Sequence, residues 1–388
     1  MRVLMIAACP LPWPRGTPIR VHRMAEALLD IGHEIHVVTY PVGDASIPVK
    51  YRIDRVASPE TALDTAPGPS FRKLAYLDPL LYARVRKLLD TQSFDVIHAH
   101  HYEGLITALL ARRGHRDIPL VFDAHTLLHS ELPQYRLGLP RRLLAGLGGR
   151  LDRWLPRLSD HVIAVSDHMR EWFISQAGIS GVRVSMIPNG VEHDHFLVEH
   201  SGIRRREAAP TVMFAGNLAE YQGVQLLFEV FRQVRDRVGN ARLVLVTGSE
   251  TDELGPAMDA LGITGSVSLV KADYASLPSH LSGADVLANP RVHCDGIPQK
   301  MLNYMAAGRG IVSFETSRGP LEDERTGLVV PDGNITAFAN AVLRLLREPG
   351  LADALGSAAR REVVAHHGWR DVAGKVTSVY RQLAGSDA

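Results

Sequence analysis

The chain has 388 residues, of which 46% are hydrophobic and 22% charged, and its formal net charge is +1. This composition is typical of a soluble globular protein, and the length suggests two domains that each bury a core. A net charge so close to zero provides no general attraction to nucleic acid, and the sequence contains no nucleic-acid-binding motif. No apolar stretch approaches the roughly 18 residues that a membrane-spanning helix needs.

The cysteine content favours a reducing compartment. Cys9 and Cys294 are far apart and form no CxxC pattern, so they predict neither a disulfide framework nor a zinc site. The apolar segment that precedes Pro10 is too short for a secretory signal. We therefore expect a cytoplasmic protein.

The first elements in chain order predict a βαβ unit. An apolar strand, Arg2 to Ala8, is followed by a polar loop, a helix from Ile19 to about Ile31 and a second strand, His33 to Tyr40. Ligands of such sheets bind beyond the carboxyl ends of the strands, which is where residues 15–17 (Arg15, Gly16 and Thr17) lie. Arg20, just inside the helix, either faces the same cleft or is a surface arginine.

Further strands and an amphipathic helix continue the pattern. The helix covers residues 71–90, and the strands are predicted at Tyr51–Val56, Phe94–His101, Ile118–His125 and Ser159–Ser166. Four histidines lie at strand ends, namely His98, His100, His101 and His125. Because they include no helix-spaced pair and have no cysteine partner, we do not expect a metal site, and for His98 and His100 the alternative is packing and hydrogen bonding at the strand ends.

Residues 135–158 form a basic, leucine-rich stretch. Six arginines accompany a single acidic residue, Asp152, and leucines and Trp154 fill the gaps. One interpretation is a peripheral surface for anionic lipid, and the other is a solvated helix that covers the sheet. Gly146, Gly148 and Gly149 argue against one uninterrupted helix.

The second half repeats the α/β pattern after a polar linker. Strands are expected at 211–218, 241–246, 267–270, 285–288 and 311–314, with the clearest helix at Val224–Asp236. The domains are therefore placed at 1–198 and 210–368, and residues 369–388 form a helix that crosses back to the first domain. Parallel sheets with right-handed crossovers are expected in both.

The stretch from Ala288 to Ser313 predicts an anion site. A strand leads through an acidic glycine loop, Asp295–Gly296, into a helix that Pro298 can start. Free N–H groups and the helix dipole then face the ligand, while a carboxylate can bind hydroxyls. Lys300 lies in the first helical turn, where a cation is unfavourable, so it has either an anionic partner or solvent around it.

Three motifs carry a resemblance to a known family. They are IPNGVE (187–192), the glycine loop around Asn217, and DGIPQKMLNYMAAGRG (295–310). The chain resembles the retaining glycosyltransferases of family 4, which have the GT-B fold. The resemblance implies an α/β architecture of two Rossmann-like domains whose parallel sheets face a central cleft. It also implies sugar transfer from a nucleotide sugar, with no bound metal or cofactor.

The resemblance assigns roles to individual residues. Asp295 would hold hydroxyls of the donor sugar, and His125 would lie close to the transferred sugar. Acceptor-side residues would be Arg15, Thr17 and Arg20. The donor-binding residues would be Gly16, Asn217, Gln222, Arg291, Gly296, Ile297, Pro298, Lys300, Asn303 and Glu322.

The sequence departs from the family at three of these positions. Asn217 and Gln222 replace the usual basic pair that holds the donor diphosphate, and Asn303 replaces a second carboxylate that holds ribose hydroxyls. Either other cations such as Lys300, Arg291, Arg15 or Arg20 bind the phosphates, or the donor carries less charge, or transfer has been lost.

The resulting functional expectation is a transferase in glycan, polysaccharide or glycolipid synthesis. Its partners would be a nucleotide sugar, a sugar or lipid-linked acceptor and, through residues 135–158, the inner face of an anionic membrane. The alternatives are a binding or partner subunit without turnover and a GT-B sugar-nucleotide epimerase.

Overall fold

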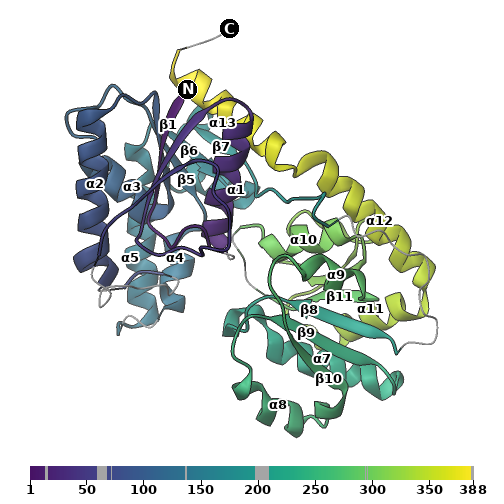
Figure 1. Ribbon diagram of the computed structural model, residues 1–388. Helices are drawn as coiled ribbons and strands as arrows, with labels where there is room; N and C mark the ends of the chain where they lie inside the picture. The colour runs from purple at the N-terminus through teal and green to yellow at the C-terminus, as the bar shows by residue number, and fades with distance from the viewer. Residues whose placement is uncertain are drawn as a thin grey trace. The chain divides into compact units, whose positions relative to one another are not determined.

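The computed structural model describes residues 1–13, 16–58, 68–70, 72–135, 138–196, 209–292, 294 and 296–385. The chain divides into two compact units (Figure 1). Unit 1 comprises Met1–Gly190 together with Trp369–Ala388, and unit 2 comprises Val191–Gly368. The last twenty residues of the chain therefore belong to the unit that begins at the first residue.

Unit 1 is built on a seven-stranded parallel sheet in the order β3-β2-β1-β4-β5-β6-β7. Its strands are β1 (Arg2–Ala7), β2 (Glu34–Thr39), β3 (Arg52–Arg55), β4 (Val96–His100), β5 (Leu120–Ala124), β6 (His161–Ala164) and β7 (Val184–Met186). Its helices are α1 (Gly16–Asp30), α2 (Asp78–Thr91), α3 (His101–Ala111), α4 (Leu128–Glu131), α5 (Arg141–Trp154), α6 (Asp167–Ser175) and α13 (Trp369–Leu383). A five-residue π-helical segment, Lys73–Leu77, leads into α2.

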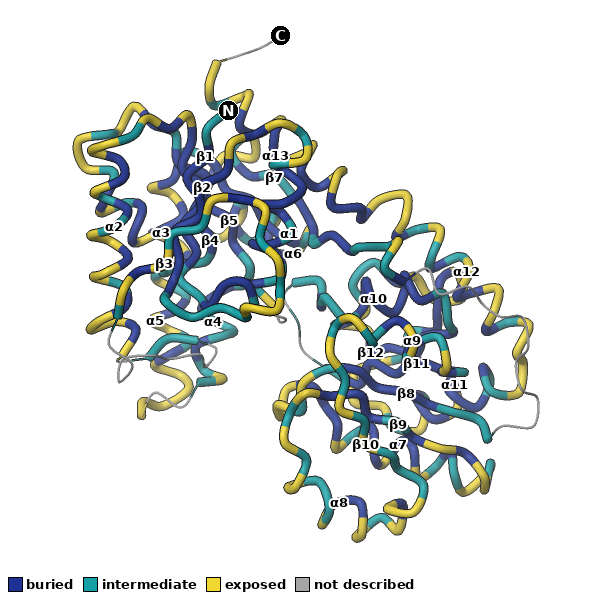
Figure 2. The backbone as a smooth tube through the Cα atoms, in the orientation of Figure 1, coloured by how far each residue is buried: buried dark blue, intermediate teal, exposed yellow. Residues whose placement is uncertain are grey.

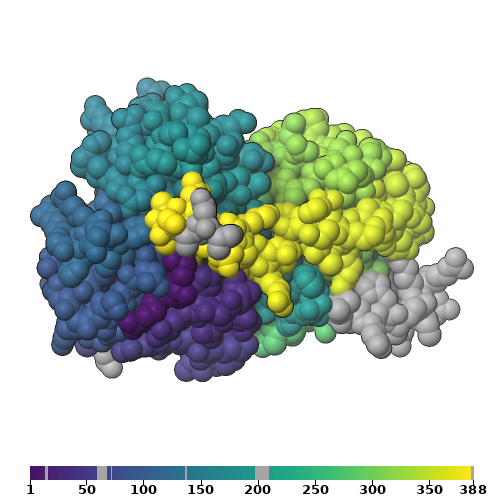
Figure 3. Space-filling model, turned by 90° about the horizontal axis from the view of Figure 1, so that it is seen from above, coloured from purple at the N-terminus to yellow at the C-terminus, as the bar shows by residue number. Residues whose placement is uncertain are grey.

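Both faces of this sheet are covered, which is why β1 is an uninterrupted apolar run. Val3 and Met5 pack with α1 and α13, whereas Leu4 and Ile6 point to the face that α2, α3 and α6 cover. Figure 3 shows the C-terminal residues, in yellow, lying beside the purple N-terminal residues. In Figure 2 the strands of this sheet other than the edge strand β3 are mostly dark blue, and the outer helices alternate dark blue with yellow.

Unit 2 has a six-stranded parallel sheet in the order β10-β9-β8-β11-β12-β13. Its strands are β8 (Thr211–Ala215), β9 (Arg242–Thr247), β10 (Val267–Lys271), β11 (Val286–Asn289), β12 (Gly310–Phe314) and β13 (Leu328–Val330). Its helices are α7 (Val224–Arg237), α8 (Gly255–Ala260), α9 (Leu277–Ser282), α10 (Gln299–Ala307), α11 (Ile335–Arg347) and α12 (Pro349–His366). The helices α7 and α11 cover one face, and α9, α10 and α12 cover the other.

The two strand orders place the ligand edge of each sheet. In both units the direction of strand succession reverses beside the first strand, between β1 and β4 in unit 1 and between β8 and β11 in unit 2. Ligands of open parallel sheets bind at the carboxyl ends of the strands at this reversal. The loops after β8 and β11, where the donor-binding residues were predicted, meet at that point.

One local expectation was wrong. Gly146, Gly148 and Gly149 were expected to interrupt a helix, but α5 runs without a break through Arg141–Trp154. The reason is tertiary, because a Cβ at Gly148 would lie 2.5 Å from the backbone carbonyl of Leu128. That glycine permits close packing of α5 against α4, which outweighs its low helix propensity.

Candidate functional site

The loops after β8 and β11 in unit 2 touch each other at a glycine. Gly223 ends the turn Glu220–Gln222 with φ of 73°, and a Cβ there would lie 2.2 Å from the carbonyl oxygen of Pro290. No other residue type fits that contact without a shift of the backbone. The close approach brings Asn217 and Gln222 from the first loop to Arg291 and Lys300 from the second loop and its helix.

Lys300 lies at the centre of this site. Its ammonium donates a hydrogen bond to Oε1 of Gln222 at 2.6 Å and lies 4.4 Å from the centroid of the Phe214 ring. Both partners are neutral, and within the described part of the chain no carboxylate pairs with it. Burial, followed by the nearby Arg291, lowers the pKa of Lys300 to about 7. Lys300 is thus a buried amine whose partners among the described residues are an amide oxygen and an aromatic ring.

Arg291 and Asn217 are connected through Tyr221. The guanidinium of Arg291 lies over the Tyr221 ring, 4.8 Å from its centroid, and the Tyr221 hydroxyl lies 3.3 Å from the amide nitrogen of Asn217. Asn217 also accepts a hydrogen bond from the backbone N–H of Ala219. Asn217 therefore shapes its own loop, and the positive charge at this edge comes from Arg291 and Lys300.

The helix α10 presents its N-terminus to the same edge of the sheet. Pro298 precedes its first residue, and no side-chain cap is bonded there. Gly296 and Ile297 lie just before it, and the carbonyl of Gly296 accepts from Sγ of Cys294 at 3.0 Å. Asp295, predicted to bind the donor sugar, lies outside the described residues.

Asn303, one helical turn after Lys300, carries an unused hydrogen-bond acceptor. The residue is only 7% exposed, and among the described residues no donor reaches its amide oxygen. Residues three apart on a helix share a face. An acceptor and a cation on one side of α10 suit hydroxyl and phosphate groups of one ligand.

Several positioning residues of this site were not found from the sequence. Tyr304 ties α10 to β8, because its hydroxyl lies 2.7 Å from the backbone nitrogen of Ala215. Asn289 donates to Ser313 and Ser317, and the Ser317 hydroxyl donates to the carbonyl of Arg291. The position of Asn289 at the end of an apolar strand is the signal that could have identified this network.

Glu322, predicted to bind the donor, lies on the surface of unit 2. Its carboxylate is 53% exposed and is bound by Arg325 from the same turn, which holds the pKa of Glu322 below its usual value. Contact with a donor would require this ion pair to open.

In unit 1 the structure does not support an acceptor role for Arg20. The side chain is buried, and its five N–H groups are all used within the protein. They donate to both carboxylate oxygens of Asp123, to the carbonyls of Ile187 and Pro188, and to the side chain of Asn189. Because no donor remains, Arg20 holds α1, β5 and the 187–189 segment together and is not available to an acceptor.

Next to this pair lies a cluster of buried histidines. His98 and His100 both have a ring nitrogen 3.5 Å from Oδ2 of Asp123, and His100 contacts Nε2 of His125 at 3.2 Å. The group His98, His100 and Asp123 has the spacing of metal ligands. However, Arg20 already compensates the charge of Asp123, so a divalent ion there would add to an existing positive charge. Burial holds the pKa of His125 well below its usual value, so the ring is neutral.

His101, which follows β4, was not singled out for binding from the sequence. Its backbone is left-handed with φ of 63°, which is uncommon for a residue with a side chain. Its ring is bracketed by Glu103 at 2.5 Å and Glu131 at 3.3 Å, and Glu131 accepts from Tyr135. Despite burial, the two carboxylates raise the pKa of His101 well above its usual value. This charged group lies beside His125.

The predicted loop at residues 15–17 is described only in part. Gly16 begins α1 with φ of 40° and open space around it, and Thr17 is partly exposed. Arg15 lies outside the described residues. The loop follows β1 and therefore stands at the ligand edge of the unit 1 sheet.

Two family models match the chain. One, described as Glycosyltransferase Family 4, matches residues 14–195, and the other, described as Glycosyl transferases group 1, matches residues 209–348. The chain belongs to this glycosyltransferase family. The chain is therefore a glycosyltransferase, and no comparison favours the partner-subunit or epimerase alternatives.

Individual relatives of this glycosyltransferase cover its full length. A phosphatidyl-myo-inositol mannosyltransferase of Mycobacterium leprae (strain TN) is 27% identical over all of this chain and 98% of its own. A sucrose-phosphate synthase from Thermosynechococcus elongatus has a TM-score of 0.82 at 20% identity, covering 99% of this chain and 100% of its own. The Anabaena protein HepE, in complex with UDP and glucose, has a TM-score of 0.76 at 18% identity, covering 98% and 100%. These structures confirm the predicted GT-B fold.

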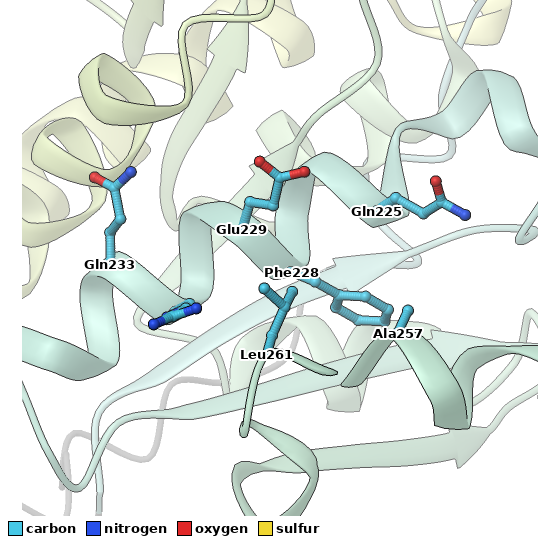
Figure 4. A pocket seen from close by; sticks show the side chains of 7 residues that line it. Gln225, Phe228, Glu229, Gln233, Ala257 and Leu261 are labelled. Carbon is cyan, nitrogen blue, oxygen red and sulfur yellow. The ribbon is translucent and has the colours of Figure 1, made fainter. Parts of the chain in front are cut away.

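A separate hollow lies on the outer surface of unit 2 of the glycosyltransferase. Figure 4 shows it between α7 and the residues around α8. Its volume is about 560 Å³. Gln225, Glu229 and Gln233 line it from α7, and Ala257 of α8 and Leu261 just after α8 line the opposite side. It is open and lies along the helices rather than at the carboxyl edge of the sheet, so it has no part in the site.

Proposed function

We propose that this glycosyltransferase transfers a sugar, with retention of its anomeric configuration, from a nucleotide sugar to a lipid-linked acceptor at an anionic membrane. The donor would occupy the site around Lys300, Arg291 and the N-terminus of α10 in unit 2. The acceptor would occupy the edge of unit 1 near His125. The relative named phosphatidyl-myo-inositol mannosyltransferase supports a lipid acceptor.

The observation that carries the membrane part is the outer face of α5. Leu143, Leu147 and Trp154 are 63%, 47% and 60% exposed and recur at the spacing of one helical face. The arginines of this helix, at positions 141, 142, 150 and 153, are exposed as well. Apolar side chains with basic neighbours suit the interface of an anionic bilayer.

The acidic residue of α5 does not weaken this surface. Asp152 is fully buried and accepts from the Tyr102 hydroxyl and from the backbone N–H groups of Leu128 and His129, at the start of α4. Because this carboxylate is buried and hydrogen-bonded inside the protein, the charged side chains on the exposed face of α5 are all basic. No helix in the described ranges is long and apolar enough to cross a bilayer.

The chemistry proposed for the site is mainly electrostatic. As the bond between sugar and nucleotide breaks, negative charge grows on the leaving diphosphate, and Lys300, Arg291 and the α10 N-terminus are placed to stabilise it. His125, being neutral, can donate a hydrogen bond to a sugar hydroxyl. Asp295 would orient the transferred sugar. Retention would follow if the acceptor hydroxyl attacks the anomeric carbon from the same face as the departing diphosphate.

Vesicle binding tests the membrane part of the proposal. The protein should float with phosphatidylcholine vesicles that contain phosphatidylglycerol and should stay unbound with pure phosphatidylcholine. The variant Leu143→Gln/Trp154→Gln should lose roughly tenfold in binding because its apolar anchors are removed. Val182→Gln, at a residue 73% exposed elsewhere in unit 1, is the matched control. Undiminished binding by the double variant would refute the role of α5.

Transfer assays test the chemical part. Vesicles that contain phosphatidylinositol should act as acceptor with one sugar nucleotide of a UDP- and GDP-sugar panel. NMR of the first product should show the anomeric configuration of the donor. Asp295→Asn should abolish transfer without unfolding the protein. A first product of inverted configuration would contradict retention.

A further inference from the structure

The position of Lys300 relative to Gln222 points to a rearranged phosphate site. The resemblance to family 4 implies basic residues that hold the donor diphosphate at the positions of Asn217 and Gln222, and this chain has neutral amides there. The structure brings the ammonium of Lys300, from another element, within 2.6 Å of the Gln222 side chain. The charge missing from the loop is therefore restored at nearly the same point by α10.

We propose that Lys300, oriented by Gln222, is the cation that binds the donor diphosphate in this enzyme, so that the binding charge comes from α10 instead of the 217–222 loop. The proposal rests on the proposed use of a nucleotide sugar. Gln222 acts as a positioning residue, because its amide oxygen accepts one N–H of the ammonium and leaves the others for phosphate oxygens.

Electrostatics favour this assignment over a structural role for Lys300. Arg291 lies near enough to disfavour its positive charge, and the α10 N-terminus disfavours it further. A structural lysine would be expected to have a carboxylate partner, whereas the partners described here are an amide and an aromatic ring. A diphosphate would relieve the repulsion between the two cations.

A second observation points to a ligand on the same face of α10. The amide oxygen of Asn303 is buried and lacks a donor within the described residues. A hydroxyl of the nucleotide ribose would satisfy this oxygen while the phosphates reach Lys300 one turn earlier. One nucleotide then supplies both a donor for the Asn303 amide oxygen and an anion for the Lys300 ammonium, two partners that the described residues do not provide.

Binding should also be coupled to proton uptake. The described titratable or charged groups around the ammonium are Arg291 and Cys294 on the loop after β11 and Tyr221 beside Gln222; Phe214 on β8 is neutral. Because the pKa of Lys300 is about 7 in the free protein, most of the molecules carry a neutral amine at pH 8. A bound diphosphate raises that pKa, so binding at pH 8 should take up part of a proton.

Titration calorimetry with GDP and UDP tests the proposal. The affinity for whichever diphosphate binds should fall roughly tenfold or more in Lys300→Met, since a charge-assisted bond is removed. The affinity for the corresponding nucleoside monophosphate should fall less. The enthalpy of wild type at pH 8 should depend on the ionisation heat of the buffer, and that dependence should disappear in Lys300→Met. Lys87→Met, at an exposed lysine of unit 1, is the matched control.

The exchanged variant Gln222→Lys/Lys300→Gln separates charge from fold. It should recover the diphosphate affinity to within about threefold of wild type, whereas Gln222→Met alone should weaken it severalfold. Unchanged diphosphate affinity in Lys300→Met, or no recovery in the exchanged variant, would overturn the proposal. If Lys300→Met binds the diphosphate with wild-type affinity and still transfers sugar, the role of Lys300 is refuted but the proposed function stands. If wild type binds neither GDP nor UDP and transfers no sugar, the role of Lys300 and the proposed function are both refuted.

Discussion

The guanidinium of Arg20 connects three segments of unit 1 that are far apart in the sequence. It bonds Asp123, 103 residues away, and the carbonyls of Ile187 and Pro188, 167 and 168 residues away. Each of its donors has an acceptor, so the burial of this charge is fully compensated. The same residue type that suggested a ligand contact in the sequence serves here to organise the fold.

Removal of this guanidinium should be costly. Arg20→Met should lower the free energy of unfolding by about 3–5 kcal/mol, because it leaves the Asp123 carboxylate buried without compensation. Urea denaturation followed by circular dichroism measures the loss. Arg20→Met/Asp123→Leu should recover part of it, and Arg116→Met, at an exposed arginine, should stay within about 0.5 kcal/mol of wild type. A double variant as unstable as the sum of its single changes would argue against a coupled pair.

The ion pair between Glu103 and His101 predicts a dependence on pH. Although burial opposes it, the imidazolium of His101 lowers the pKa of Glu103 from 4.5 to about 2 in the folded protein. A lowered folded-state pKa adds stability above the unfolded value, and this stability is lost as the pH falls from about 4.5 towards 2. Glu103→Gln should therefore cost about 1–3 kcal/mol at pH 7.

Urea midpoints at pH 7 and pH 3.5 check this prediction. The difference between wild type and Glu103→Gln should shrink at the lower pH, because Glu103 of the unfolded wild type then binds a proton and part of the stability from the ion pair is lost. Glu253→Gln, at an exposed glutamate in unit 2, controls for general acid effects. An equal difference at both values would show that the pair adds no pH-dependent stability.

At the scale of elements, the close packing of α5 on α4 determines which glycine of α5 can be replaced. Gly148→Ala places a Cβ 2.5 Å from the Leu128 carbonyl and should destabilise the protein by about 1–3 kcal/mol. Gly146→Ala, two residues earlier on the same helix, meets nothing within 4 Å and should stabilise by about 0.5–1 kcal/mol. Thermal unfolding of the two variants gives the comparison. Stabilisation by both substitutions would mean that helix propensity alone governs this helix.

The element scale also shows which helices were missed. Residues 349–366 form the eighteen-residue helix α12, which was not predicted from the sequence. Its buried residues are mostly small, including Ala352, Gly356 and Ala359. A Cβ at Gly356 would lie 2.4 Å from the carbonyl of Gly308 at the end of α10. Small side chains allow this helix to pack closely but give it only a weak apolar periodicity. For this reason the helix was not predicted from the sequence.

At the scale of the molecule, the fold of unit 1 depends on the end of the chain. Val376 and Tyr380 of α13 are fully buried in the core of unit 1, and the Tyr380 hydroxyl contacts His98, 282 residues away, at 2.5 Å. Val376→Asp should therefore destabilise unit 1 by more than about 3 kcal/mol, since it buries an uncompensated charge. Lys375→Asp, at the exposed neighbour, is the matched control.

Limited proteolysis followed by mass spectrometry reads out this prediction for each unit. New cleavages in Val376→Asp should fall within residues 1–190, whereas unit 2 should keep the wild-type pattern. Cleavage confined to residues 191–368 would contradict the assignment of α13 to unit 1.

The sequence by itself determined the class of the protein. Apolar runs that alternate with amphipathic helices predicted two parallel α/β sheets, because burial on both faces makes each strand continuously apolar. Contiguous motifs such as IPNGVE and DGIPQKMLNYMAAGRG indicated the family, and the loops after β8 and β11 were placed at the ligand edge in advance. These features depend on residues that are neighbours in the chain, so local pattern suffices to find them.

Only the tertiary structure decided which side chains meet. Lys300 was one of several candidate cations until the sheet order brought it to Gln222, 78 residues away. Arg20 was assigned a ligand role until Asp123 and the 187–189 segment were seen to use all its donors, and Asp152 became an internal anchor once α5 packed on α4. The periodicity of apolar residues indicates which side of a helix or strand faces the core. Which side chains contact each other depends on strand order and helix packing, because these bring residues together that are distant in the sequence.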